Sequence, residues 1–64
     1  MNRVGQTFKV AATTYLVIQE LTGQWDVLPH DAHGHLIVSL VTNKQMKVSE
    51  AYLASLEERG ARLT

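Results

Sequence analysis

Hydrophobic and polar residues alternate along much of the first two thirds of the chain, which is the pattern of β-strands with a buried face. The first such segment is 7–12. Phe8, Val10 and Ala12 share one face of it, and Lys9 lies on the other. This segment therefore predicts a strand.

The next segment, 13–21, is rich in β-branched and aromatic residues, which also favour a strand. A helix is the competing interpretation, because several apolar residues here recur at helical spacing. Leu16 and Val17 would fall off that apolar stripe, and β-branched residues lose rotamer freedom in a helix. We therefore predict a strand.

A third strand is predicted over 25–30, bounded by turns at 22–24 and 31–34 that contain glycine. Trp25 begins its alternating pattern. Pro29 lacks a backbone donor, so the strand should end there or lie at a sheet edge.

The fourth and strongest strand signal covers 35–42, and 43–45 interrupt it. A helix is then predicted from Ser49, whose hydroxyl suits an N-cap, to Gly60, which suits a helix end. Its apolar stripe consists of Tyr52, Leu53 and Leu56. The tail 61–64 either returns as a short closing strand or frays.

These elements predict a mainly β (α+β) fold: a four-stranded antiparallel sheet or small SH3-like barrel with one C-terminal helix. The order of four short strands with a helix near the end resembles the layout of small SH3-like barrels, in topology only. Such a fold would not by itself specify a function. Residues 1–64 are expected to form a single small domain.

Two of the predicted strands carry apolar residues on both faces, and one short helix can cover only one of them. The second face then needs barrel closure or a partner, and an exposed apolar face is typical of an interface. Trp25 fits either the core or an interface. The candidate interface residues are Tyr15, Val17, Trp25, Ile37 and Val41.

Composition narrows the class of protein. The 64 residues include no cysteine, which excludes disulfides and thiolate metal sites. Because so small a core gives marginal stability, we expect a homo-oligomer or a larger partner. The polar N-terminus lacks a secretory signal, which predicts a cytoplasmic protein, and the apolar runs are too short to span a membrane.

Three histidines, His30, His33 and His35, lie close together in the sequence beside Asp31. Imidazole and carboxylate groups can bind zinc or nickel, but this spacing matches no established zinc signature. A pH-sensitive loop is a second interpretation, and an ordinary polar turn is preferred. No metal or other cofactor is predicted.

No nucleophile stands at a recognisable spacing from a base, and no phosphate-binding loop occurs, so the sequence predicts a protein that is not an enzyme. The formal net charge is zero. Two basic pairs could still contact the phosphates of a nucleic acid, namely Lys44 with Lys47 and Arg59 with Arg62.

The leading hypothesis is a small non-enzymatic protein–protein interaction module that self-associates and binds another protein through a sheet face or edge. Compact chains without motifs are common among accessory proteins of phages and mobile elements, which dock on larger machines. The alternative is a small nucleic-acid-binding regulator that uses the two basic pairs.

Overall fold

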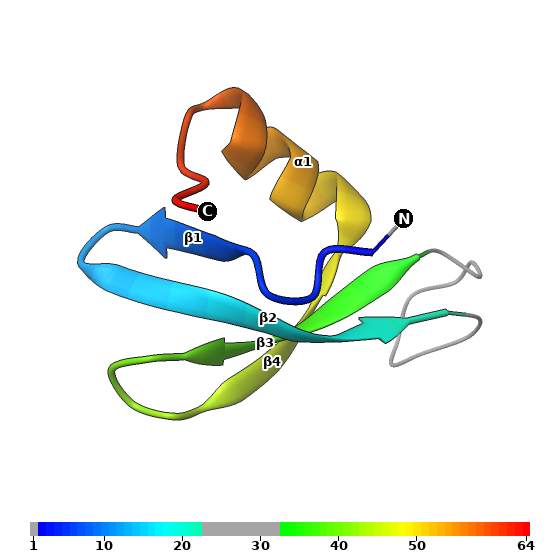
Figure 1. Ribbon diagram of the computed structural model, residues 1–64, viewed down its shortest axis with the longest axis horizontal. Coiled ribbons are helices and arrows are strands. Elements are labelled where there is room, and N and C mark those ends of the chain that lie inside the picture. The colour runs from blue at the N-terminus through cyan, green and yellow to red at the C-terminus, as the bar shows by residue number, and fades with distance from the viewer. Residues whose placement is uncertain (1, 23–32) are drawn as a thin grey trace.

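The computed structural model describes residues 2–22 and 33–64 (Figure 1). The predicted strand 25–30, with Trp25, and His30 lie outside the described residues. The elements follow in this order: β1 (Thr7–Val10), β2 (Thr13–Leu21), β3 (Gly34–Ser39), β4 (Gln45–Ser49) and α1 (Glu50–Glu58).

The strands form one antiparallel sheet in the order β1-β2-β3-β4, and α1 lies across one face of it (Figure 1). The four-stranded sheet with a C-terminal helix is thus confirmed. β1 and β4 do not pair with each other, so among the described strands the sheet stays open and the barrel alternative does not hold.

The first strand ends two residues earlier than the predicted strand 7–12. β1 stops at Val10, which pairs with Thr13, and Ala11 takes a positive φ of 56° in the intervening turn. Such turns usually contain glycine or asparagine. Two alanines gave no turn signal, so the sequence pattern assigned them to the strand. β2 has the predicted bounds, 13–21.

The strand predicted over 35–42 ends earlier, at Ser39, because residues 40–44 form the turn to β4. The Ser39 hydroxyl stabilises this turn by accepting from the backbone N–H groups of Val41 and Thr42. β4 was not predicted. Its glutamine and lysine disfavour strands in isolation, and it is an edge strand whose pairing with β3 decides its conformation.

A β-bulge in β2 decides which way Glu20 points. Val17 pairs with Ile37, but Gln19 pairs with the next residue of β3, Leu36, so Ile18 is an extra residue in β2. A one-residue shift exchanges the two faces of a strand. After the bulge, Glu20 therefore lies on the face that α1 covers.

The predicted helix caps are confirmed. The Ser49 hydroxyl accepts from the backbone N–H of Tyr52 at 3.1 Å. The helix ends at Glu58 with Arg59 as its C-cap. Gly60 follows with a φ of +80°, and the N–H of Ala61 donates to the carbonyl of Leu56. The tail then returns along β1 and does not fray, but it forms only an isolated antiparallel bridge between Phe8 and Arg62 and not a full strand.

Gly60→Ala should lower the free energy of unfolding by about 1 kcal/mol, measured by urea denaturation. The cause is the positive φ alone, because a Cβ at this position would meet nothing within 4 Å. Gly60→Asn is the control, since asparagine tolerates this backbone conformation better, and it should lose less. An equal loss for both variants would contradict the explanation.

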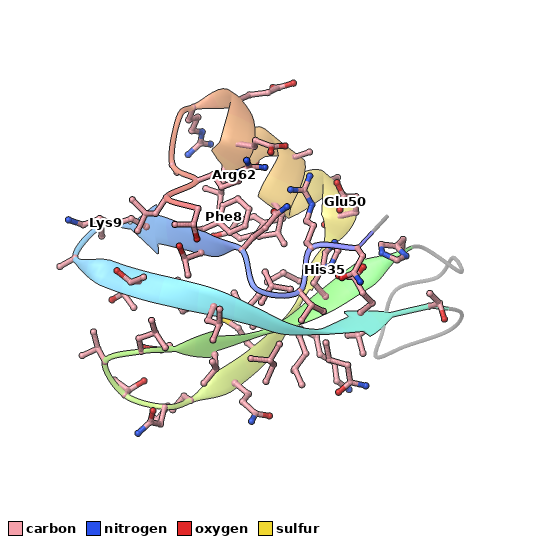
Figure 2. All side chains as sticks on the ribbon, viewed as in Figure 1. Phe8, Lys9, His35, Glu50 and Arg62 are labelled. Atoms are coloured by element: carbon pink, nitrogen blue, oxygen red, sulfur yellow. The ribbon has the colours of Figure 1, made fainter. Side chains whose placement is uncertain are left out.

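The apolar core lies between the sheet and α1 (Figure 2). Among the described residues it contains five buried apolar side chains, those of Phe8, Val17, Ile37, Leu53 and Leu56. Tyr52, which the sequence placed on the helix's apolar stripe, is 38% exposed. So small an apolar core leaves part of the space beneath the helix to polar residues.

Candidate functional site

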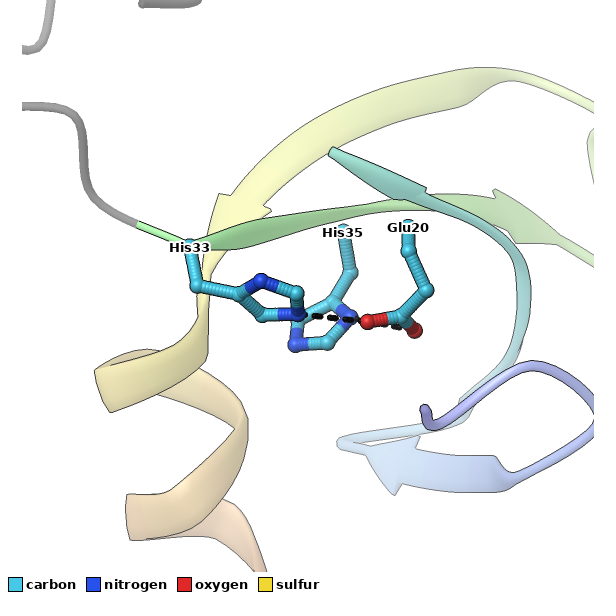
Figure 3. A group of neighbouring side chains, drawn as sticks. All are labelled: Glu20, His33 and His35. Carbon is cyan, nitrogen blue, oxygen red and sulfur yellow. Dashed lines mark hydrogen bonds and ion pairs between the residues drawn. The ribbon is translucent and has the colours of Figure 1, made fainter. Parts of the chain in front are cut away.

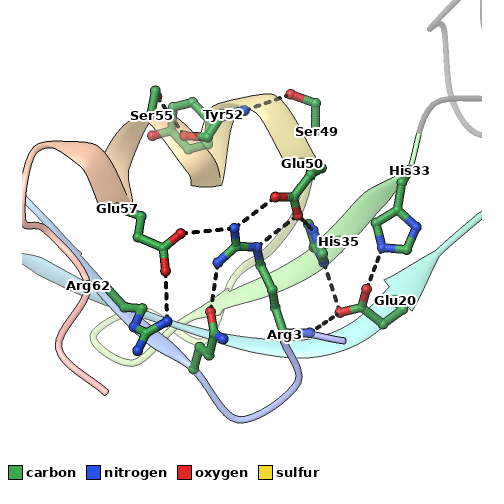
Figure 4. Close-up of polar contacts among 11 residues, drawn as sticks. Arg3, Glu20, His33, His35, Ser49, Glu50, Tyr52, Ser55, Glu57 and Arg62 are labelled. Atoms are coloured by element: carbon green, nitrogen blue, oxygen red, sulfur yellow. Dashed lines mark hydrogen bonds and ion pairs between the residues drawn. The ribbon is translucent and has the colours of Figure 1, made fainter. Parts of the chain in front are cut away.

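A cluster of ionisable side chains lies between the sheet and α1 (Figure 4). Its members come from the N-terminal segment, β2, β3 and its preceding residue, and α1. We call it the polar cluster, and it consists of Arg3, Glu20, His33, His35, Glu50 and Glu57.

Arg3 lies at the centre of the polar cluster and is 4% exposed. Its Nε and one terminal nitrogen donate to the two carboxylate oxygens of Glu50, both at 2.8 Å. The same terminal nitrogen lies 3.2 Å from Glu57, and the other donates to Gln6 at 2.9 Å. This two-pronged pairing joins the N-terminal segment to α1.

His35 is fully buried and contacts a carboxylate at each ring nitrogen. Nδ1 lies 2.9 Å from Oε2 of Glu20, and Nε2 lies 2.6 Å from Oε1 of Glu50. Through these two contacts His35 bridges β2 and α1.

Glu20 links the two histidines (Figure 3). Its Oε1 lies 2.5 Å from Nε2 of His33, and its Oε2 also accepts from the backbone N–H of Arg3 at 2.8 Å. The two imidazole rings meet edge to face, with centroids 5.0 Å apart. His33 is 30% exposed, so the cluster reaches solvent at this residue.

The hydrogen bonds favour the ionised form of each glutamate. Those from Arg3 lower the pKa of Glu50 to about 2 and hold the pKa of Glu57 below its usual value. Burial opposes ionisation of Glu20, but the hydrogen bonds from Arg3 and both histidines outweigh it, and its pKa is lowered. The hydrogen bond to Glu50 in turn raises the pKa of Arg3.

Chemically, this arrangement offers one carboxylate and two imidazoles that converge from different strands. Their potential ligand atoms all lie within 4.8 Å of one another. Nitrogen and oxygen donors at such a spacing can share protons or bind a metal ion. No buried polar side-chain atom among the described residues lacks a hydrogen-bond partner, and no pocket opens in the described part of the chain.

The candidate interface residues that the structure describes lie in different environments and do not form one surface. Val17 and Ile37 are each 1% exposed and belong to the core beneath α1, so they do not lie on an open face. Tyr15 is half-buried and packs against that core. Val41 is 67% exposed in the β3–β4 turn, and Trp25 lies outside the described residues.

The basic residues form two separate pairs, as the sequence suggests. Lys44 and Lys47 are exposed in the β3–β4 turn and on β4, whereas Arg59 and Arg62 follow α1 on the other side of the sheet (Figure 1). Arg62 forms an ion pair with Glu57 at 2.7 Å.

Sequence reasoning identified His33 and His35 but missed Arg3, Glu20 and Glu50 as their partners. The pairing of Glu20 with His35 depends on the bulge at Ile18, which the hydrophobic pattern does not reveal. The burial of Arg3 had no local signal, because the segment around it is polar.

Comparison of the chain with protein families, with curated proteins and with solved structures found no match. Among the described residues, no helix has both the length and the apolar character needed to cross a membrane.

Proposed function

We propose that the chain is a small non-enzymatic protein–protein interaction module that docks through the sheet face opposite α1, here called the outer face. The strand register assigns Leu16, Leu36 and Val38 to the middle of this face, because they alternate with the residues that point toward α1. All three are half-buried, and no described element lies on that side of the sheet in Figure 1. An apolar sheet surface without a covering layer favours an interface.

The rim of the outer face is polar and basic. Gln19 and Gln45 pair with its apolar residues, Lys47 pairs with Leu36, and Lys9 lies on the same side of β1. The glutamates that the structure describes all belong to the helix side instead, namely Glu20, Glu50, Glu57 and Glu58. This charge pattern fits a protein partner with an apolar centre and an acidic rim.

A second copy of the chain, which the sequence analysis favours, is the competing occupant of the outer face. Two outer faces brought together would place lysines from both copies around one interface, and like charges across an interface disfavour association. We therefore prefer a different protein as the partner. In the cell, this partner would be part of a larger assembly on which the chain docks, as accessory proteins do.

The nucleic-acid alternative has less support. Its four basic residues lie in two pairs on different sides of the sheet, so they do not form one phosphate-binding surface. The pairing of Arg62 with Glu57 also offsets part of the positive charge of one pair.

Leu36→Glu should weaken docking, because it places a charge in the middle of the apolar surface. We would capture partners from an extract of the source organism, purify a captured protein and measure its direct Kd for the chain. Leu36→Glu should raise this Kd at least about tenfold. Lys47→Glu should raise it several-fold, mainly by slowing association, and added salt should reduce that difference.

Tyr52→Glu is the matched control, because Tyr52 is also a partly exposed apolar residue but belongs to α1. It should leave the Kd unchanged. A partner that binds Leu36→Glu as tightly as the unaltered chain would contradict the proposal. Sedimentation showing a micromolar dimer that Leu36→Glu dissociates would instead establish the second copy as the occupant.

A further inference from the structure

We propose that Glu20, His33 and His35 form a binding site for a divalent first-row transition-metal ion, of which zinc is the best match. The three residues come from β2, from β3 and from the residue that precedes β3, and they meet because Glu20 pairs with His35 in the sheet register. Figure 3 shows both rings directed at the Glu20 carboxylate. This site is independent of the outer face.

The chemistry of the three side chains selects the class of metal. Two imidazole nitrogens and one carboxylate oxygen suit zinc and its neighbours in the first transition row. Magnesium and calcium prefer all-oxygen sites and are disfavoured here. Three protein ligands leave at least one coordination position for water or for a ligand from a partner.

The surroundings of His35 supply a second, independent argument. Histidines that bind a metal usually donate their other ring N–H to a carboxylate, which orients the ring and selects its tautomer. His35 has this arrangement: Nδ1 faces Glu20, while Nε2 lies 2.6 Å from Oε1 of Glu50. Arg3 in turn holds Glu50 through two hydrogen bonds of 2.8 Å.

The distances require only a small adjustment. Nε2 of His33 and Nδ1 of His35 lie 2.5 Å and 2.9 Å from the Glu20 oxygens, as expected when protons hold the groups together. Two zinc ligands at about 2.0–2.1 Å and a tetrahedral angle lie about 3.3 Å apart. A metal ion would replace the protons between Glu20 and the rings, and these pairs would separate by less than about 1 Å. The two imidazole nitrogens, which lie within 4.8 Å of each other, would adjust to the same spacing.

Access is available through His33. His35 is fully buried, but His33 is 30% exposed and Glu20 is 20% exposed. The metal would therefore enter from the end of the sheet at which β2 ends and β3 begins. The buried His35 would be held in a fixed orientation, and the more exposed His33 would complete the coordination of the ion.

The test uses the full chain, freed of metal by a chelator, at pH 7.5. Zinc at 100 times its Kd should raise the midpoint of thermal unfolding by about 20 °C, with one ion bound per chain by calorimetry. Magnesium should leave the midpoint unchanged. Absence of a zinc-dependent shift, or one ion shared between two chains, would overturn the proposal.

Variants and nuclear magnetic resonance locate the ion. His33→Ala should lose the zinc-dependent shift and remain folded, because His33 lies at the edge of the polar cluster. His30→Ala is the matched control and should retain the shift. In the unaltered chain, zinc should change the ¹⁵N resonances of Nε2 of His33 and Nδ1 of His35. Zinc binding without these two changes, or binding that survives in His33→Ala, would place the ion elsewhere and refute the assignment.

Discussion

Arg3→Met is expected to destabilise the protein by about 3–5 kcal/mol, because it removes the cation from a buried ion pair and leaves the Glu50 carboxylate without its main partner. A chain of 64 residues has a total stability on the order of 3–10 kcal/mol. The variant should therefore lose a large part of the stability of the fold. Urea denaturation followed by circular dichroism would measure this loss.

Arg62→Ala is the matched control, since Arg62 also pairs with Glu57 but is 42% exposed. Exposed ion pairs contribute only about 0–1 kcal/mol, so this variant should remain close to the unaltered chain. Arg3→Lys should fall between the two, because lysine keeps the charge but not the planar two-pronged geometry. A loss below about 1 kcal/mol for Arg3→Met would show that the polar cluster does not hold the fold together.

The sequence predicted the features that depend on local residue patterns, but not those that depend on which residues the fold buries. β2 was predicted with correct bounds because most of residues 13–18 are β-branched or aromatic, which favours a strand. The ends of the helix were predicted from Ser49 and Gly60, because an N-cap hydroxyl and a glycine after the last turn act on their immediate neighbours in the chain. Arg3 and Arg62 look alike in the sequence, and only the fold buries one and exposes the other.

The errors have the same origin, because they occur where distant contacts decide the outcome. β4 is polar and becomes a strand by pairing with β3. Ala11 adopts a positive φ without the usual turn residue. Simple alternation would place Glu20 on the outer face, and the bulge at Ile18 turns it toward His35 instead. The candidate metal site therefore could not be read from the spacing of the histidines.

The polar cluster should make the stability of the protein depend on pH in the acid range. The hydrogen bonds from Arg3 and His35 stabilise ionised Glu50 and lower its pKa from 4.5 to about 2. A group with a lowered pKa in the folded state stabilises the protein above its unfolded pKa, and this contribution is lost as the pH falls toward the folded pKa. We expect Glu50 to contribute about 3 kcal/mol above pH 5, which declines between about pH 5 and pH 2.

Glu50→Gln tests this contribution because it removes the titrating group and keeps the size of the side chain. At pH 7 the variant should be less stable than the unaltered chain, and the difference in free energy of unfolding should narrow to near zero by about pH 2, where Glu50 is itself protonated. Glu58→Gln, at an exposed position of α1, should follow the unaltered chain throughout. Parallel stability curves for Glu50→Gln and the unaltered chain would mean that Glu50 is not ionised preferentially in the folded state, and that Arg3 and His35 do not hold α1 on the sheet through its charge.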